Sequence, residues 1–215
     1  MDLFGNSNDW STKLEPILTN YKGRKHPLDY GSWYQLLVMV VLSAQDSDAN
    51  INAIAPALFK AYPNMQSLAV ADKQMFLTYV SKVKNFGSKT NWLMEIAQNI
   101  QKDENIPLNM KGLVALKGIG RKSANVILRE AKIAAEGIIA DLHVIRVAPR
   151  IGLTVATSDG NKVEKQLMQV FPKSIWNEIG MSISFLGREI CRPKPKCDSC
   201  LLKNCCAYYG DLEPQ

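Results

Sequence analysis

Residues 116–124, with the sequence LKGIGRKSA, combine a Gly-x-Gly turn with basic side chains. Gly118 and Gly120 permit positive φ angles and close approach, so backbone amides near a helix N-terminus can bind a phosphate oxygen with no side chain in the way. A plain turn between two helices would use the same glycines. The basic residues beside them are Lys117, Arg121 and Lys122. Because these cations accompany the turn and helices are expected on both sides, we favour a helix-hairpin-helix that binds DNA backbone without reading its sequence.

Asp141 follows Lys122 by nineteen residues and lies in a second segment that could carry chemistry, IIADLHV at 138–144. An acidic residue that enters a helix after an apolar run can be merely an N-cap. His143 beside it can likewise be an ordinary histidine at a helix start. A functional interpretation of Asp141 therefore requires Lys122 as its partner.

All five cysteines lie in the last 25 residues of the chain, in the pattern C-x5-C-x2-C-x4-C-C. They are Cys191, Cys197, Cys200, Cys205 and Cys206. A disulfide framework would spread its bridges along the chain, so the clustering indicates a local metal site in a reducing compartment. Four thiolates at this spacing suit either a tetrahedral zinc ion or a [4Fe-4S] cluster, and the spacing alone does not choose between them.

Charge and hydropathy limit the remaining possibilities. The chain has 26 basic and 20 acidic residues, a net charge of +6, and residues 111–150 alone carry +5. Such a stretch is typical of a phosphate-facing surface or of a solvated helix face. The longest apolar run, 36–42, is far shorter than the ~20 residues of a membrane span, and no secretion signal opens the sequence. We therefore expect an intracellular protein without a membrane partner.

Apolar residues recur at helical spacing almost throughout, with no convincing strand pattern, which predicts an all-α fold. The expected helices cover residues 13–22, 31–43, 47–60, 72–84, 88–102, 123–135, 142–150, 161–171 and 176–190. The second of these is nearly all apolar and should be a central core helix.

Several residues should shape these helices. Asp46, Ser88 and Asp159 are the expected N-terminal caps of the third, fifth and eighth helices, because short polar side chains accept bonds from free backbone amides. Pro56 should kink or divide the third helix. The side chains expected to surround the core helix are Trp33, Phe76, Trp92 and Met94.

The chain resembles the endonuclease III family of DNA glycosylases with AP-lyase activity in three segments that occur in the same order. These are LKGIGRKSANVIL, ADLHVIRVAPRIGL and GREICRPKPKCDSCLLKNCC. In addition, LSAQDSD at 42–48 matches the Ser-Ala-Gln segment of the family. The likeness covers about residues 14–209.

This resemblance implies that Lys122 attacks the sugar carbon that bears an oxidised pyrimidine, so that the base leaves and a protein–DNA Schiff base forms. β-Elimination then breaks the strand. An ordinary lysine, with a pKa of about 10.4, is protonated at neutral pH, so Lys122 must be made less basic. A helix start, nearby Arg121 and partial desolvation all act in that direction. Asp141, by resemblance, stabilises positive charge on the sugar or assists proton transfer, and ionisation at a helix N-terminus suits the first role better.

The target nucleotide must be flipped out of the duplex, and the resemblance assigns the filling of the gap to Gln45. The family carries a bulky apolar residue on a second wedge loop, where this chain offers Asn85 or Phe86. Leu142 also replaces a usual threonine, and Lys117 a usual proline. The expected DNA contacts are Gln45, Lys117, Gly118, Gly120, Arg121 and His143.

The resemblance favours a [4Fe-4S] cluster over zinc. The family's usual pattern has six residues in the first gap and five in the last. The last gap selects Cys206 as the fourth ligand beside Cys191, Cys197 and Cys200, which leaves Cys205 spare. The first gap is one residue shorter here, so Cys205 is the alternative fourth ligand.

We thus expect an all-α protein of two helical domains with a DNA-binding cleft between them. Residues 26–135 should form a helical barrel that ends in the hairpin helix, and residues 1–25 plus 136–215 should carry the iron-sulfur loop. The expected partner of this monomer is double-stranded DNA with a damaged base or an abasic site. A monofunctional uracil, thymine-mismatch or adenine glycosylase and a non-catalytic DNA-binding module are the alternatives. Lys122 argues against the first, and Lys122 with Asp141 against the second.

Overall fold

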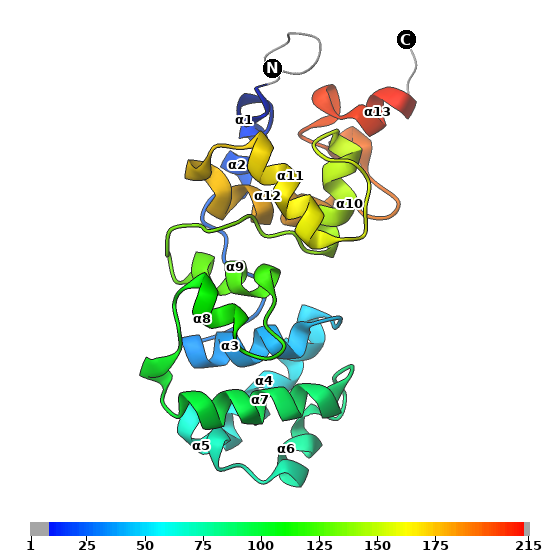
Figure 1. Ribbon diagram of the computed structural model, residues 1–215. Coiled ribbons are helices and arrows are strands. Elements are labelled where there is room, and N and C mark those ends of the chain that lie inside the picture. Colours follow the sequence, from blue (N-terminus) through cyan, green and yellow to red (C-terminus); the bar gives the residue numbers. More distant parts are fainter. Residues whose placement is uncertain (1–8, 213–215) are drawn as a thin grey trace. The chain divides into compact units, whose positions relative to one another are not determined.

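The computed structural model describes residues 9–212, and every regular element in that range is a helix (Figure 1). The all-α prediction is therefore confirmed. The chain divides into two compact units, one made of the residues through Arg24 together with those from Ala135 onward, the other of Lys25–Ala134. None of the helices in the described range is long and apolar enough to cross a membrane.

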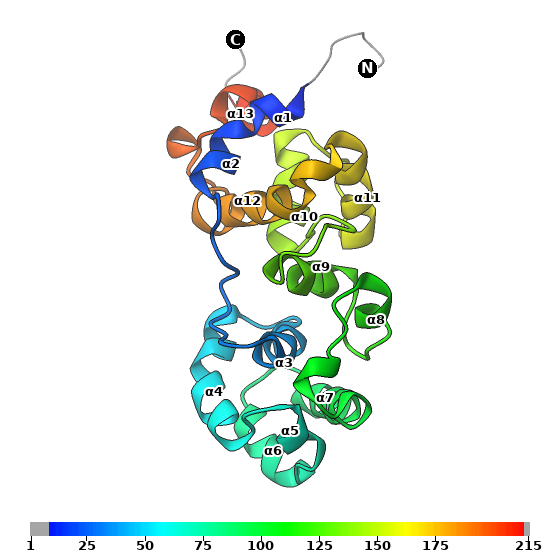
Figure 2. The ribbon, with the colours of Figure 1, turned by 90° about the vertical axis from the view of Figure 1, so that its left-hand side faces the viewer.

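The Lys25–Ala134 unit is built around α3 (Trp33–Ser43), as the apolar run predicted. Every residue from 36 to 42 is buried. The helices α4 (Asp48–Ala61), α7 (Phe86–Ile100) and α9 (Arg121–Glu130) contact α3 directly, and Figure 2 shows α3 between α9 and α7. The unit also contains α5 (Met65–Ala69), α6 (Lys73–Val80), the 3-10 turn η1 (Asp103–Asn105) and α8 (Met110–Val114).

Two predictions about this unit need correction. Trp33, expected in the core, is 39% exposed because it occupies the first turn of α3, ahead of the apolar run. Phe76 is buried as predicted, and Trp92 and Met94 are half-buried. Pro56 does not divide α4, which is continuous. Its ring is exposed, so water can replace the hydrogen bond that proline removes.

Two of the three predicted caps are also wrong. Ser47, and not Asp46, caps α4 by accepting a bond from the Asn50 amide. α7 starts at Phe86, two residues before the predicted cap Ser88. The cap of α11 (Gly160–Val170) is Asp159, as predicted.

The other unit centres on α12 (Trp176–Glu189), which is buried continuously from Ile179 through Gly187. It packs against α2 (Glu15–Asn20) and α10 (Leu142–Ile151). A Cβ on Gly180 would lie 2.6 Å from the Ile139 carbonyl oxygen, so glycine is needed for this close approach. The remaining elements are α1 (Trp10–Lys13), η2 (Lys173–Ile175), η3 (Cys197–Ser199), η4 (Lys203–Cys205) and α13 (Ala207–Leu212).

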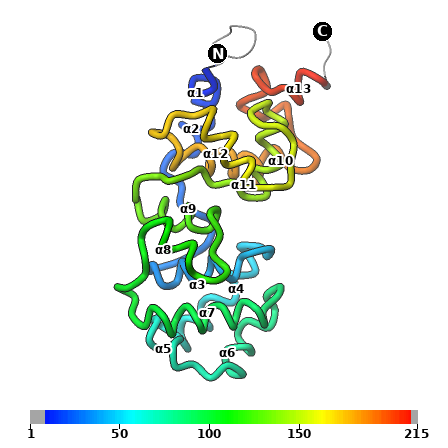
Figure 3. Tube along the Cα trace, in the orientation of Figure 1, coloured from blue at the N-terminus to red at the C-terminus, as the bar shows by residue number. Residues whose placement is uncertain are grey.

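The structure differs from the predicted elements mainly at short helices. The helix expected over 13–22 is split into α1 and α2 at Leu14. The single-turn helices α5 and α13, whose courses can be followed in Figure 3, were not expected as helices, and α8 was expected only as the helix that leads into the hairpin, without bounds. Elements of five or six residues contain too few periods for a hydrophobic pattern to reveal them.

Candidate active site and cysteine loop

The Gly-x-Gly turn joins α8 to α9 and is fixed against α7. Gly118 has φ +80°, a conformation that side-chain-bearing residues rarely adopt. A Cβ at this position would lie 2.5 Å from Cε3 of Trp92, so the glycine backbone rests on the indole ring. Ile119, next along the turn, is 4% exposed and anchors it from inside. The turn is thus a packed feature of the unit.

Lys117 makes a second link between the turn and α7. Its Nζ lies 2.7 Å from Glu95 Oε2, and Glu95 stands one helical turn after Trp92. Both charged side chains are largely exposed, and such pairs contribute at most about 1 kcal/mol. A phosphate can therefore compete with Glu95 for Lys117 at little cost.

Lys122 lies in the first turn of α9, because the helix begins two residues earlier than the predicted start at residue 123. The helix begins at Arg121, and its N-cap is Gly120 in extended conformation. Nothing within 4 Å would meet a Cβ on Gly120, so the space at this helix start is open. Lys122 is half-buried, and the buried stretch of α9 begins immediately after it. Lys122 accordingly lies at the edge of the core.

Gln45 and Asn85 occupy the tips of two loops that meet. Both residues adopt left-handed backbone conformations, with φ of 59° and 58°. Asn85 Nδ2 donates to Gln45 Oε1 at 3.4 Å. The Asn85 side chain is exposed and does not cap α7. Phe86, the other candidate for the second wedge, is the first residue of α7 and is 40% exposed. Of these two candidates, Asn85 is therefore the one that hydrogen bonds to Gln45.

A buried lysine that sequence reasoning missed holds the Gln45 loop. Lys89, 1% exposed, donates from Nζ to the carbonyl oxygens of Leu42 at 2.7 Å and Ala44 at 2.6 Å. Burial lowers the pKa of Lys89, while the nearby Asp46 carboxylate opposes that change. The lysine thus satisfies free carbonyls at the end of α3, immediately before Gln45.

Asp46 ties the same loop to the one that carries Asn85. Its Oδ2 accepts a hydrogen bond from the Lys84 amide at 2.7 Å, and its Oδ1 accepts one from the Ser47 amide at 2.8 Å. Burial disfavours the charged form, but the hydrogen bonds outweigh it and lower the pKa of Asp46. Asp46 therefore links two loops instead of capping α4.

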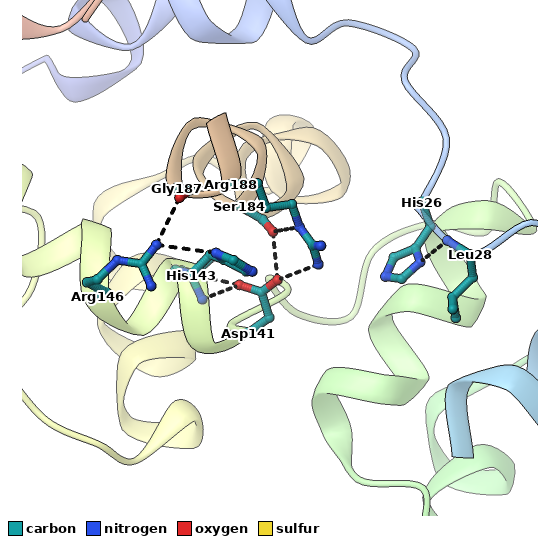
Figure 4. A network of polar contacts seen from close by, with 9 residues as sticks. His26, Leu28, Asp141, His143, Arg146, Ser184, Gly187 and Arg188 are labelled. Carbon is teal, nitrogen blue, oxygen red and sulfur yellow. Dashed lines mark hydrogen bonds and ion pairs between the residues drawn. The ribbon is translucent and has the colours of Figure 1, made fainter. Parts of the chain in front are cut away.

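Asp141 is the N-cap of α10 and also the centre of a polar network that reaches α12 (Figure 4). Its Oδ1 accepts from the amides of His143 and Val144, both at 2.9 Å. Its Oδ2 accepts from the Ser184 hydroxyl at 2.6 Å and lies 3.5 Å from Arg188 Nη2. Burial opposes ionisation, but these donors and the nearby positive charge lower the pKa of Asp141. The side chain is therefore a carboxylate at neutral pH.

Arg146 connects this network to the cysteine loop. Its Nη2 lies 3.3 Å from His143 Nδ1 and donates to the Gly187 carbonyl at 2.9 Å, while its Nε donates to the Cys191 carbonyl at 3.2 Å. Figure 4 shows Arg146 reaching toward both His143 and Gly187. Leu142, beside Asp141, is 73% exposed. The start of α10 is therefore held by hydrogen bonds to α12, while the Leu142 side chain is exposed to solvent.

Four of the five cysteines line one small cavity. They are Cys191, Cys197, Cys200 and Cys206, and Lys196 and Lys203 also contribute to its wall. Cys205 is not part of this lining, and its Sγ lies 3.4 Å from the Leu202 carbonyl oxygen and 3.9 Å from that of Lys13. Across residues 9–212, no three Cys, His, Asp or Glu side chains are grouped so as to hold a single metal ion.

Arg150, at the end of α10, holds the first part of the cysteine loop. Its Nη1 lies 3.6 Å from Cys191 Sγ and donates to the Arg192 carbonyl at 2.8 Å, and its Nη2 donates to the Pro193 carbonyl at 3.1 Å. The guanidinium also lies over the Tyr208 ring, 5.0 Å from its centre. No sequence signal distinguished Arg150 from the other cations of this stretch.

Comparison with known proteins agrees with this arrangement. Residues 38–173 match the family described as HhH-GPD superfamily base excision DNA repair protein. The chain is 36% identical to endonuclease III of Synechocystis sp., over 86% of each chain, and 32% identical to endonuclease III of Haemophilus influenzae, over 94% of this chain and 98% of that one. Its fold is also similar to that of a trapped endonuclease III–DNA covalent intermediate. The TM-score is 0.85 and the identity 27%, over 94% of this chain and 96% of the other.

Proposed function

The chain belongs to the endonuclease III family of base excision DNA repair proteins, and we propose that this DNA glycosylase is bifunctional. It removes oxidised pyrimidines from double-stranded DNA and cleaves the resulting abasic site by β-elimination. The observation that carries this proposal is the position of Lys122 in the first turn of α9, directly after the packed Gly-x-Gly turn. The similarity to an endonuclease III trapped covalently on DNA supports a covalent step here as well.

In this proposal the neutral amine of Lys122 attacks C1′ of the flipped-out nucleotide, and the bond from C1′ to the base breaks. The partial positive charge of the α9 N-terminus favours the neutral amine that the attack requires. The amine passes one proton to the departing base. The C1′–O4′ bond of the sugar ring then opens, O4′ takes up a proton, and the nitrogen is left in a protonated imine with C1′. Loss of a C2′ proton and departure of the 3′ phosphate complete the β-elimination, and hydrolysis of the imine frees the enzyme.

Asp141 supplies the negative charge in this scheme. As an ionised carboxylate it stabilises the positive charge that develops on the sugar as the base departs. The lowered pKa of Asp141 favours this electrostatic role over one in which the carboxyl group carries the transferred proton.

The DNA contacts that we propose follow from the same elements. Backbone amides at the open start of α9 bind a phosphate, since the Gly120 cap leaves the approach unobstructed. Lys117, Arg121 and His143 add backbone contacts. Gln45 fills the gap left by the flipped nucleotide, and Asn85 accompanies it from the neighbouring loop.

We further propose that the cysteine loop holds a [4Fe-4S] cluster. The donor set supports this, because four cysteines surround one cavity and Cys205 lies outside it. Four thiolates are the ligands that a [4Fe-4S] cluster requires. Cys206 is then the fourth ligand. Such a cluster would supply rigidity to the loop and would present Arg192, Lys194, Lys196 and Lys203 to DNA phosphates.

Reduction of the covalent intermediate tests the catalytic proposal. The protein is incubated with duplex DNA carrying a single oxidised pyrimidine in the presence of sodium borohydride, with a uracil-containing duplex and an undamaged duplex as controls. We expect a covalent adduct with the oxidised substrate, and its absence for Lys122→Gln. An unadducted product lacking only the base would instead identify a monofunctional glycosylase.

A further inference from the structure

We propose that Ser184, together with Arg188, is a positioning residue for base removal, because it holds the carboxylate of Asp141 in one orientation. This inference rests on the proposed function, in which Asp141 stabilises the sugar as the base departs. Ser184 lies 43 residues further along the chain, on α12, and nothing in the sequence associates it with Asp141.

The geometry determines where the hydroxyl proton of Ser184 points. Arg188 Nε donates to Ser184 Oγ at 3.3 Å, which occupies an acceptor site of the hydroxyl. The hydroxyl then donates its own hydrogen to Asp141 Oδ2 at 2.6 Å. Because Arg188 Nη2 also lies 3.5 Å from that oxygen, the two residues hold Asp141 Oδ2 from the same side (Figure 4).

Both carboxylate oxygens are thereby held, but by different parts of the unit. The amides of His143 and Val144 hold Oδ1 and belong to the helix that Asp141 itself caps. The contacts from α12 restrain the carboxylate at its second oxygen, Oδ2. An electrostatic stabiliser is most effective when its charge is fixed before the reaction, so this restraint contributes directly to the rate.

The burial of Ser184 indicates that its hydroxyl serves this contact. Its exposed fraction is 0%, and a buried hydroxyl is unfavourable unless it is hydrogen bonded. Ser182, on the same helix and 1% exposed, makes no hydrogen bond within the described residues. The two serines therefore offer a matched comparison of similar burial with and without a contact to Asp141.

The charged groups that act on Asp141 come from two helices. His143 belongs to α10, where Arg146 contacts its ring, and Arg188 belongs to α12. Removing the Ser184 hydroxyl leaves His143, Arg146 and Arg188 in place and takes away one hydrogen-bond donor to the ionised carboxylate of Asp141. The pKa of Asp141 should then rise, and the acid side of the pH–rate profile should move to higher pH.

The test compares Ser184→Ala with Ser182→Ala in the full-length protein. The rate of base removal is measured at saturating enzyme in a single turnover from pH 4 to pH 8, along with DNA affinity and thermal unfolding. Loss of a hydrogen bond to a charged group slows the reaction by about tenfold or more. We expect this loss, with the acid limb shifted upward, for Ser184→Ala. Affinity should stay within about twofold, and Ser182→Ala should match wild type in rate and profile.

The outcomes separate this inference from the proposal on which it rests. If wild-type protein traps on DNA with borohydride but Ser184→Ala retains the wild-type rate and pH profile, the positioning role is wrong. Equal losses for both serine variants would also refute it, because they would indicate a general effect on α12. If wild type does not trap at all, the bifunctional mechanism itself fails. Ser184→Cys, which keeps the volume and offers only a weak donor, gives the same readout should the alanine variant fold poorly.

Discussion

Gly118 rests on the face of Trp92 so closely that its missing Cβ would lie 2.5 Å from the ring carbon Cε3. The contact joins the tip of the hairpin to the middle of α7, 26 residues away in sequence. The position of the α9 start, and with it that of Lys122, is therefore set partly by an indole ring. Substitutions at the two hairpin glycines should for this reason have different consequences.

Gly118→Ala should lower the free energy of unfolding by about 2–3 kcal/mol, since the new methyl group meets the indole and the backbone has φ +80°. Gly120→Ala is the matched control, because its Cβ would meet nothing within 4 Å. It should unfold nearly as wild type and instead weaken DNA binding by covering the start of α9. Denaturant titrations and binding assays measure the two effects. Equal stability losses would contradict the packing argument.

Lys89→Met should impair base removal more than cleavage of a preformed abasic site. The substitution keeps the apolar stem and leaves the carbonyls of Leu42 and Ala44 without their donor, at a cost of about 2 kcal/mol in stability. The Gln45 loop that follows would lose the contacts that hold it. Flipping a nucleotide that still carries its damaged base should depend on that loop more than binding an abasic sugar does.

Single-turnover rates on the two substrates check the Lys89 prediction. Lys84→Met, on an exposed side chain of the adjacent loop, is the control and should change both rates equally or not at all. A uniform loss on the two substrates for Lys89→Met would place its effect in overall folding and not in the loop.

The stability of the protein should depend on pH through Asp46 and Asp141. The pKa of each carboxyl group is lowered in the folded protein. A group of this kind stabilises the fold above its unfolded pKa, about 3.9, and the stabilisation is lost as pH falls through the folded value. The free energy of unfolding should thus decline steadily below about pH 5.

Asp141→Asn provides the variant for this titration. Asparagine is a good N-cap, so the α10 start should persist, while the interaction with Arg188 is lost. We expect a shallower decline in stability at acid pH and a loss of base removal of at least about a hundredfold. An acid dependence identical to that of wild type would show that Asp141 does not contribute to it.

Cys205→Ser and Cys206→Ser should differ in iron content. Cys206 lines the cavity with Cys191, Cys197 and Cys200, whereas the Cys205 thiol contacts the Leu202 carbonyl. We expect Cys206→Ser to lose the brown colour and most of its iron, and Cys205→Ser to keep both. Iron and sulfide analysis with the visible spectrum of each purified protein measures this. Stoichiometric zinc in a colourless wild-type protein would overturn the cluster assignment.

The sequence predicted those features whose determinants are local. The start of α9 beside Lys122 follows from the Gly-x-Gly turn, and the N-cap role of Asp141 from one polar residue after an apolar run. The central helix follows from its uninterrupted apolar residues. Such patterns lie within one or two helical turns and can be seen without knowing what packs against them.

Features that depend on distant partners were missed. Lys89 donates to a residue 47 positions away, Ser184 to one 43 away, and Arg150 to one 41 away. A lysine in the apolar stripe of α7 was a signal that could have been noticed, since Leu93, Ile96 and Ala97 share its buried face. The burial of Trp33 was predicted wrongly because Trp33 is the first residue of α3, and a residue at a helix end is less constrained to face the core than one in the middle of the apolar run.

The seven-residue interval between Gly180 and Gly187 covers almost two turns, so both glycines lie on one face of α12. A Cβ at the first would meet the Ile139 backbone, and one at the second would lie 2.9 Å from the His143 Cβ. Enlarging either would displace the helix that carries Ser184 and leads into Cys191. If the proposed cluster is bound, base removal and cluster binding thus depend on the same helix packing, and a colony screen for loss of the cluster's colour should also recover enzymes with slowed repair.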